Sequence, residues 1–401
     1  MKNVPKLRFK DDNGRDFPAW RDTPLEKLAS VERGKFTVRP RNDPKYFGGK
    51  TPFIQTGDIV ASGLYLKKYS QTLNEDGLKV SKLFPVNTIL ITIAANIGDT
   101  TITSFDVACT DSVVAIQPLK NIAVPVWIKY SLDTKKEELD SKATQNAQKN
   151  INLQVLKPLI FSTPCFKEQT KIADFLTAID DRISQLSQKC DGLAQYKKGV
   201  MQKIFSQELR FKDENGRAFP AWEEKRLGDV SSFFSGGTPL TTNRTFYDGN
   251  IPFIKSGEIN SSSTAQFITE SGLNNSSAKI VMAGDLLYAL YGATSGEVAI
   301  SKINGAINQA VLCIRSEIDT YFLYSYLFFE KQSILEKYLQ GGQGNLSADI
   351  IKSLKIPTPS KPEQEKVAGF LSAVDEKINQ AQAQLDALKQ YKQGLLQQMF
   401  V

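Results

Sequence analysis

The stretch KLRFKDDNGRDFPAW, residues 6–20, returns almost unchanged as ELRFKDENGRAFPAW at residues 208–222. The two stretches start 202 residues apart (208 minus 6) and differ only where Lys6, Asp12 and Asp16 are replaced by Glu208, Glu214 and Ala218. A period of this length far exceeds the ~20–50 residues of a solenoid repeat. The sequence therefore predicts two copies of one whole domain.

Two further islands of similarity continue the duplication: TPFIQTGDI at 51–59 returns as IPFIKSGEI at 251–259, and EQTKIADFL at 168–176 returns as EQEKVAGFL at 363–371. Between the islands the copies barely agree, as in residues 36–41 against 238–243. This pattern indicates one scaffold that presents two different surfaces.

A strict seven-residue repeat of apolar positions closes each copy, and we call these positions the seam. In the first copy one series of seam positions is Ile172, Ile179, Leu186, Leu193 and Val200, and the second series is Leu176, Ile183, Cys190, Lys197 and Ile204. In the second copy the two series are Val367, Val374, Ala381, Leu388 and Leu395, and Leu371, Ile378, Leu385, Lys392 and Met399. Heptads sustained in this way predict a coiled coil. Because the two seams match in length, the helices are expected to pair with each other, antiparallel, as a rod of roughly 50 Å.

Short apolar segments rich in β-branched residues, such as 88–93 and 285–290, predict buried strands in the remainder of each copy. The expected fold class is α+β, with two pseudo-two-fold-related globular domains separated by a two-helix antiparallel coiled coil. The predicted bounds are a first globular domain at 1–163, a first long helix at 164–206, a second globular domain at 207–358 and a second long helix at 359–401.

Composition narrows the function classes. Fifty Lys and Arg against 43 Asp and Glu give a net charge of +7, which favours an anionic partner without requiring one. The chain has no histidine, which removes the usual general base and the commonest zinc ligand. Its four cysteines form no CxxC pair, so neither a disulfide framework nor a metal site is expected. With neither a membrane span nor a signal peptide predicted, we expect a cytoplasmic protein.

The islands and helices together resemble one known family, the specificity (S) subunit of type I restriction-modification enzymes. The resemblance covers essentially the whole chain and rests on three motifs. These are Pro164, Glu168, Gln169, Lys171, Ile172, Ala173, Phe175 and Leu176, then Pro359, Glu363, Gln364, Lys366, Val367, Ala368, Phe370 and Leu371, and the turn Ser235-Gly236-Gly237-Thr238-Pro239 followed by residues 249–258. The first copy departs from the pattern at Arg33-Gly34-Lys35-Phe36, where the second has Ser235-Gly236-Gly237-Thr238.

The resemblance implies a subunit without catalysis of its own. Each variable half would read one part of a split target in double-stranded DNA, and the helices would space the halves and dock two modification (methyltransferase) subunits. Those subunits would carry S-adenosylmethionine, and restriction (translocase/nuclease) subunits would use ATP and Mg, so no cofactor or metal is expected on this chain. In agreement, the chain contains neither a Pro-Pro pair nor a Pro-Asp pair, which the usual amino-methyltransferase and nuclease motifs need.

Candidate DNA-contacting residues are the polar, basic and aromatic side chains of the diverged loops, because Arg and Lys can bind guanine edges or phosphates and Asn and Gln can read adenine. They are Arg33, Lys35, Arg39, Arg41, Lys45, Tyr46, Thr56 and Asn96 in the first copy, and Thr238, Asn243, Arg244, Tyr247, Lys255, Ser256, Tyr291 and Gln309 in the second. Candidate partner-binding residues are Gln148, Asn150, Glu168, Gln169, Lys197, Gln343, Asn345, Glu363, Gln364 and Lys392.

Several alternatives stay open. The loops around Gln148 and Gln343 could be capped turns that enter a final strand, and Lys197 and Lys392 could extend to solvent from a frayed seam, fix the helix register or dock a partner. Trp20 and Trp222 are expected to pack in the core. A coiled-coil scaffold with two protein-binding heads is the alternative function.

Overall fold

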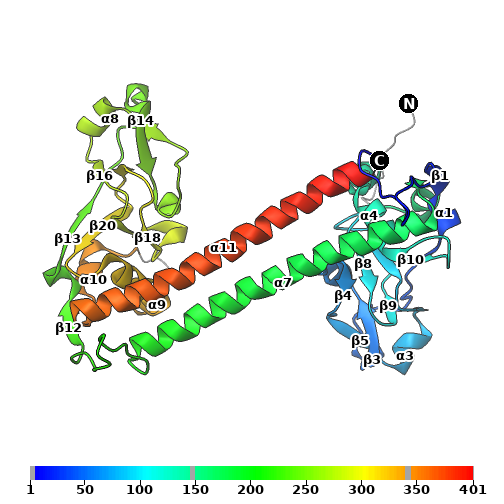
Figure 1. The fold of residues 1–401 in the computed structure, drawn as a ribbon, viewed down its shortest axis with the longest axis horizontal. Coiled ribbons are helices and arrows are strands. Elements are labelled where there is room, and N and C mark those ends of the chain that lie inside the picture. The colour runs from blue at the N-terminus through cyan, green and yellow to red at the C-terminus, as the bar shows by residue number, and fades with distance from the viewer. Residues whose placement is uncertain (1–4, 145–149, 339–344, 401) are drawn as a thin grey trace. The chain divides into compact units, whose positions relative to one another are not determined.

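The computed structural model describes residues 5–144, 150–338 and 345–400 (Figure 1). It divides into two compact units, one made of Met1–Ser187 with Ala383–Val401 and the other of Gln188–Gln382. Each unit therefore combines one globular region with parts of both long helices.

Two sheets and a two-stranded ribbon form the first globular region. The larger sheet has the order β2 (Ala29–Arg33), β10 (Val113–Pro118), β7 (Ile89–Thr92), β8 (Thr100–Thr103) and β4 (Tyr65–Leu66). The smaller has the order β5 (Gln71–Leu73), β3 (Phe47–Ile54), β9 (Val107–Cys109) and β6 (Leu83–Phe84), and the ribbon pairs β1 (Arg21–Pro24) with β11 (Ile160–Thr163). The helical segments are α1 (Leu25–Leu28), η1 (Pro44–Tyr46), α2 (Thr56–Val60), α3 (Glu75–Lys79), α4 (Pro125–Asp133), α5 (Lys136–Thr144) and α6 (Leu153–Leu156).

The larger sheet is apolar on both faces. Side chains alternate across a strand, so Ile89 and Ile91 of β7 point to one face and Leu90 to the other. Ile89 and Ile91 belong to the core cluster that contains Trp127 of α4, whereas Leu90 packs with Phe84 of the smaller sheet. The continuous Ile-Leu-Ile run is thus explained by a strand that is covered on both sides.

The second unit repeats this topology, except that its first sheet has no counterpart of β4 among the described residues. Its sheets have the orders β13 (Ser231–Ser235), β20 (Val311–Ser316), β17 (Leu286–Ala289), β18 (Val298–Ile300), and β15 (Phe267–Ile268), β14 (Tyr247–Ile254), β19 (Gly305–Ile307), β16 (Lys279–Val281), and its ribbon pairs β12 (Glu223–Arg226) with β21 (Lys355–Thr358). The helical segments are η2 (Leu227–Asp229), η3 (Arg244–Phe246), η4 (Ser256–Glu258), α8 (Glu270–Asn274), η5 (Gly292–Thr294), α9 (Thr320–Tyr338) and α10 (Ala348–Ser353).

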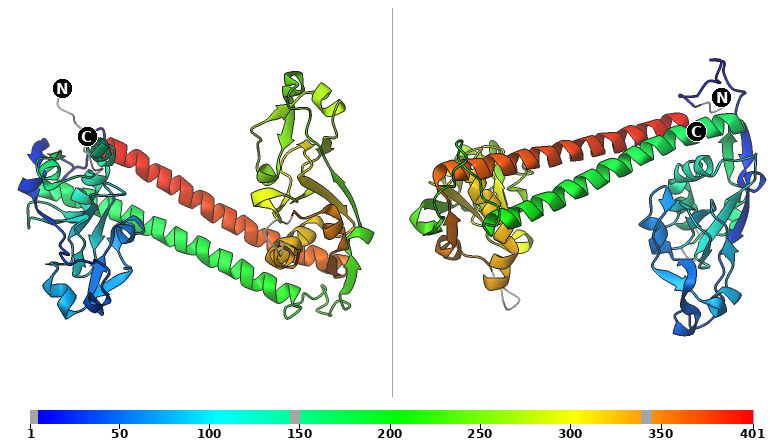
Figure 2. Two further views of the ribbon diagram at one scale, coloured as in Figure 1. Left: turned by 180° about the vertical axis from the view of Figure 1, so that it is seen from behind. Right: turned by 60° about the horizontal axis from the view of Figure 1, so that its bottom comes forward.

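The two long helices are α7 (Phe166–Phe205) and α11 (Lys361–Met399), and each contributes one part to each unit (Figure 1 and Figure 2). In the first unit the beginning of α7, at Ile172 and Leu176, shares a core cluster with Met399 at the end of α11. In the second unit Leu371 of α11 clusters with Ile204 of α7. The helices are therefore antiparallel within each unit, and the predicted α+β class with a two-helix coiled coil is confirmed.

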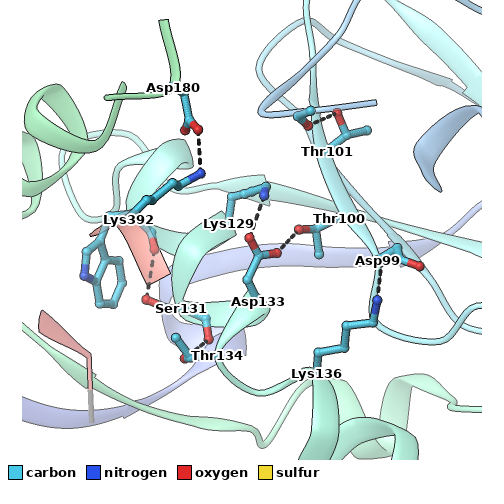
Figure 3. Close-up of polar contacts among 12 residues, drawn as sticks. Asp99, Thr100, Thr101, Lys129, Ser131, Asp133, Thr134, Lys136, Asp180 and Lys392 are labelled. Carbon is cyan, nitrogen blue, oxygen red and sulfur yellow. Dashed lines mark hydrogen bonds and ion pairs between the residues drawn. The ribbon is translucent and has the colours of Figure 1, made fainter. Parts of the chain in front are cut away.

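Both seam lysines form ion pairs between the helices. Lys197 lies 2.7 Å from Asp375 and Lys392 lies 2.5 Å from Asp180, and the exposed fractions of all four side chains lie between 11% and 21%. Lys392 also lies over the ring of Tyr130, 4.7 Å from its centroid, and Figure 3 shows its ammonium directed at Asp180. The lysines therefore do not extend freely into solvent, contrary to the frayed-seam alternative, and their ion pairs agree with a role in helix register. A partner-docking role for them stays a prediction.

Polar contacts also connect α4 to the larger sheet of the first unit (Figure 3). Asp133, at the end of α4, accepts hydrogen bonds from Lys129 one turn earlier, at 2.5 Å, and from the hydroxyl of Thr100 in β8. Lys136 of α5 pairs with Asp99, next to Thr100. These contacts fix α4 and α5 to β8 and to the residue before it.

Candidate nucleic-acid interface

The carboxyl ends of two parallel strands meet at one edge of the smaller sheet in the first unit. β3 pairs with β9 so that Phe53 faces Ala108 and Ile54 faces Cys109. Gln55 follows β3 directly, and Asp111 lies two residues beyond β9. A pocket of about 270 Å³ opens here, lined by Phe36, Arg41, Asn42, Phe47, Phe53, Gln55, Thr56, Gln71, Thr110, Asp111 and Ser112.

Asp111 holds two of the predicted arginines at this edge. The Arg41 guanidinium donates to the Asp111 carboxylate at 2.5 Å, and Arg33 Nε donates to the Asp111 backbone carbonyl. Arg41 stays 49% exposed, so its side chain remains accessible from solvent. Arg39, by contrast, donates to the nearby Val38 carbonyl at 2.8 Å. Arg33 and Arg41 are thus presented in fixed orientations, which lowers the entropy lost when they bind an anion.

Gln55 displays an amide at the mouth of the same pocket. Its Nε2 donates to Gln71 Oε1 at 3.0 Å, and its backbone N–H donates to Asp58 Oδ2 at 2.8 Å. Sequence reasoning missed Gln55, Gln71 and Asp111. The available signal was the Gln55-to-Lys255 difference, which is the one change of charge between residues 51–59 and 251–259.

The second unit repeats the register with different residues. β14 pairs with β19 so that Phe253 faces Ala306 and Ile254 faces Ile307, which places Lys255 and Gln309 at the positions of Gln55 and Asp111. Gln309 Oε1 accepts a hydrogen bond from the Thr238 hydroxyl at 2.8 Å, and both side chains are exposed. The structure thus brings together three of the predicted residues of the second copy: Thr238, Lys255 and Gln309.

Other predicted residues divide by exposure. Lys35, Asn96 and Arg244 are exposed, as is Lys45, which pairs with Asp43 at 3.3 Å; Thr56 and Ser256 are half-buried. Four other predicted side chains make contacts within their own units. Tyr46 packs edge-on against Phe36, and Tyr291 packs against the core of the second unit. Asn243 accepts a hydrogen bond from the Thr245 N–H, and the Tyr247 hydroxyl donates one to the Pro239 carbonyl at 2.6 Å. Burial raises the pKa of Tyr247, so its hydroxyl stays protonated as a donor.

The prediction that Glu168 and Glu363 contact a partner is wrong, because both side chains are fully buried. Glu168 accepts from Arg8 Nε at 3.0 Å and from Trp20 Nε1 at 3.0 Å. Glu363 receives the same contacts from Arg210 at 3.1 Å and Trp222 at 3.0 Å. These carboxylates fasten the repeated stretches 6–20 and 208–222 to the starts of α7 and α11.

The neighbouring glutamines are likewise structural and not partner-binding. Gln169 accepts from the Val124 N–H at 2.9 Å and donates to the Pro164 carbonyl at 3.0 Å. Gln364 accepts from the Asp319 N–H at 2.8 Å and donates to the Pro359 carbonyl at 2.8 Å. Each glutamine thus joins the start of a long helix to the segment before α4 or α9.

The remaining partner candidates precede α6 and α10 in the sequence. Asn150 is half-buried and forms an isolated bridge with Ala94, while Asn345 is exposed. Gln148 and Gln343 lie outside the described residues. A docking role for these residues stays a prediction.

Within the described ranges, no group of three or more His, Cys, Asp or Glu side chains is placed to hold a metal ion. Cys109 and Cys313 are buried in the strand cores, and burial raises the pKa of each thiol to about 12. No helix in this part of the chain is long and apolar enough to cross a membrane.

Comparisons with known proteins agree with this architecture. The model of the type I restriction modification DNA specificity domain matches the chain twice, at residues 19–192 and 221–390. The MjaIX specificity subunit of Methanocaldococcus jannaschii is 24% identical over 373 residues, covering 88% of this chain and 86% of that relative. The MjaVIII specificity subunit of the same organism is 23% identical over 309 residues, covering 72% of each chain.

The fold is similar to that of the type I restriction-modification S subunit from M. genitalium, with a TM-score of 0.65 at 18% identity, covering 100% of this chain and 99% of that one. The two family matches take up most of the sequence and include both globular regions and most of both long helices. The chain therefore belongs to the type I restriction-modification DNA specificity family, with two tandem specificity domains.

Proposed function

We propose that this chain is the non-catalytic reading subunit of a type I restriction-modification complex, in which each unit reads one part of a bipartite target in double-stranded DNA. The observation that carries the proposal is the shared register at the sheet edge. The same strand pairs are followed by Gln55 and Asp111 in one unit and by Lys255 and Gln309 in the other. A common scaffold with different hydrogen-bonding groups at one place is what two readers of different sequences require.

Catalysis and cofactors would belong to the partners. Two modification subunits would bring S-adenosylmethionine and methylate adenine, and restriction subunits would bring ATP and Mg. The absence of histidine, Pro-Pro and Pro-Asp from the sequence supports this division of labour.

The paired helices would set the gap between the two half-sites. α7 and α11 each pass from one unit into the other, and no loop interrupts either helix. Adding one heptad to each helix at that passage lengthens both by about 10 Å while preserving the seam. The expected result is a longer gap in the methylated motif with unchanged half-sites.

A scaffold with two protein-binding heads is the competing function. It would use the same coiled coil, but it predicts no dependence of any DNA motif on the diverged loops. The fixed arginines Arg33 and Arg41 favour the DNA reading, because pre-oriented guanidinium groups suit guanine edges and phosphates.

The test is to co-express the chain with candidate modification subunits and to map N6-methyladenine in the host DNA by single-molecule sequencing. Residues 37–150 and 238–345 are each exchanged for the corresponding segment of a relative. The expected result is a split motif in which each exchange changes only one half. A complex that assembles but methylates no motif dependent on this chain would contradict the proposal.

A further inference from the structure

One position in each unit combines a fixed backbone with a changed side chain. Residue 55 follows β3 and residue 255 follows β14, and the backbone N–H of each donates to the carboxylate three residues later, to Asp58 at 2.8 Å and to Glu258 at 3.4 Å. The backbone is thus held in the same way in both units. The side chain at this position is left to vary without altering the fold.

The surroundings of Gln55 place its amide at the rim of the pocket. The rings of Phe36 and Phe53, buried in the pocket floor, lie 4.9 Å apart between centroids. Gln71 accepts from Gln55 Nε2, which fixes the plane of the Gln55 amide while Oε1 and the second N–H stay available. The amide is therefore pre-oriented, as a base-reading group needs to be.

Charge near the rim differs between the units. In the first unit the pocket carries Arg41, oriented by the Asp111 carboxylate, beside the neutral amides of Gln55 and Gln71. In the second, Lys255 places a cation at the position of Gln55, and a neutral Gln309 stands at that of Asp111. The positive charge therefore lies at a different position of the sheet edge in each unit.

Resting on the proposed function, we propose that residues 55 and 255 are equivalent base-reading positions, with Gln55 taking an adenine edge in one half-site and Lys255 a guanine edge in the other. A glutamine amide matches N6 and N7 of adenine, and a lysine ammonium matches O6 and N7 of guanine. Asp111 is a positioning residue in this scheme, because it acts through Arg41.

The experiment exchanges the glutamine at position 55 and the lysine at position 255, one at a time, in the full chain co-expressed with its modification subunits. Gln55→Lys is expected to lower methylation of the original motif at least tenfold and to create a motif with guanine in place of adenine at one position of the first half-site. Lys255→Gln is expected to make the converse change in the second half-site only. Gln55→Ala is expected to accept more than one base at that position.

The matched control is Lys302→Gln, which removes an exposed lysine of the second unit outside this edge and should leave the motif unchanged. Co-purification with the modification subunits confirms assembly of each variant. Wild-type methylation of the original motif by both exchange variants would overturn the inference, as would loss of assembly by all three edge variants, which would mark the position as structural. Failure of the proposed function is distinguishable, because the wild-type chain itself would then direct no motif.

Discussion

At the scale of single residues, the most informative side chains are the two buried glutamates, Glu168 and Glu363. A buried carboxylate must be paired and hydrogen-bonded, because desolvation of an isolated charge costs several kcal/mol. Each receives an arginine and a tryptophan N–H from the repeated stretch at the start of its own globular domain. This pairing explains why stretches separated by about 150 residues recur together in both copies.

Glu168→Ala should therefore destabilise the first unit. The substitution leaves Arg8 and the Trp20 N–H without their acceptor, and Arg8 is partly exposed, so we expect the free energy of unfolding to fall by about 2–3 kcal/mol. Denaturant unfolding measures this loss, and hydrogen exchange in residues 6–20 locates it. Glu137→Ala, an exposed glutamate of the same unit, is the control and should change stability by under about 0.5 kcal/mol. Equal losses in both variants would contradict the role of Glu168.

Acid should weaken one ion pair of the second unit. Two hydrogen bonds from Arg315, at 2.8 and 2.7 Å, hold the pKa of Asp285 below its ordinary value. Because the folded pKa is lowered, the stabilisation is fully present above the unfolded pKa of about 3.9 and is lost as pH falls through the folded pKa. The difference in Tm between the wild type and Asp285→Asn should be largest near pH 6–7 and shrink below about pH 4. A difference that does not vary with pH would count against this pairing.

At the scale of elements, the ion pairs between α7 and α11 should fix how the helices register. Lys197→Glu would place a second carboxylate against Asp375, which already accepts a hydrogen bond from the Tyr321 hydroxyl. Because the site is mostly buried, we expect a loss of about 2–4 kcal/mol in the free energy of unfolding.

Adding Asp375→Lys to Lys197→Glu restores opposite charges and should recover at least half of that loss, and a double-mutant cycle measures the coupling. Lys197→Met is the matched control, since it keeps most of the apolar stem of the side chain and removes the ion pair without introducing a like charge. If the reversed pair recovers nothing, the lysine contributes through packing alone.

The elements also show what a sequence can and cannot predict. The long helices follow from the seam, because an apolar repeat in a helix needs no knowledge of the rest of the chain. Buried strands follow from runs such as Ile89-Leu90-Ile91 for the same reason. The role of Asp111 could not be predicted, because it depends on the register between β3 and β9, which are more than 50 residues apart in sequence. Glu168 and Gln169 were misassigned because recurrence marks intramolecular packing as readily as a shared docking surface.

At the scale of the whole molecule, the effect of the net charge of +7 depends on where the charged side chains lie. Lysines and arginines are spread over both units. At the sheet edges their positions differ between the units, although the strand register is the same. Net charge brings a protein to DNA without regard to sequence. Oriented groups at the two edges would then supply the discrimination between sequences.

This division of roles predicts how salt acts on DNA binding by the assembled complex. If the complex contacts about 6–10 phosphates, its affinity should fall roughly 10³–10⁵-fold between 50 and 200 mM salt. Lys35→Gln, which removes an exposed cation beside the edge of the first unit, should weaken binding to all sequences alike and reduce the salt slope by about one phosphate contact. Gln55→Lys should instead change the preferred sequence and leave the affinity for unrelated DNA within a few-fold of wild type. Fluorescence anisotropy with matched and unrelated duplexes measures both quantities, and binding that does not depend on salt would favour the protein scaffold.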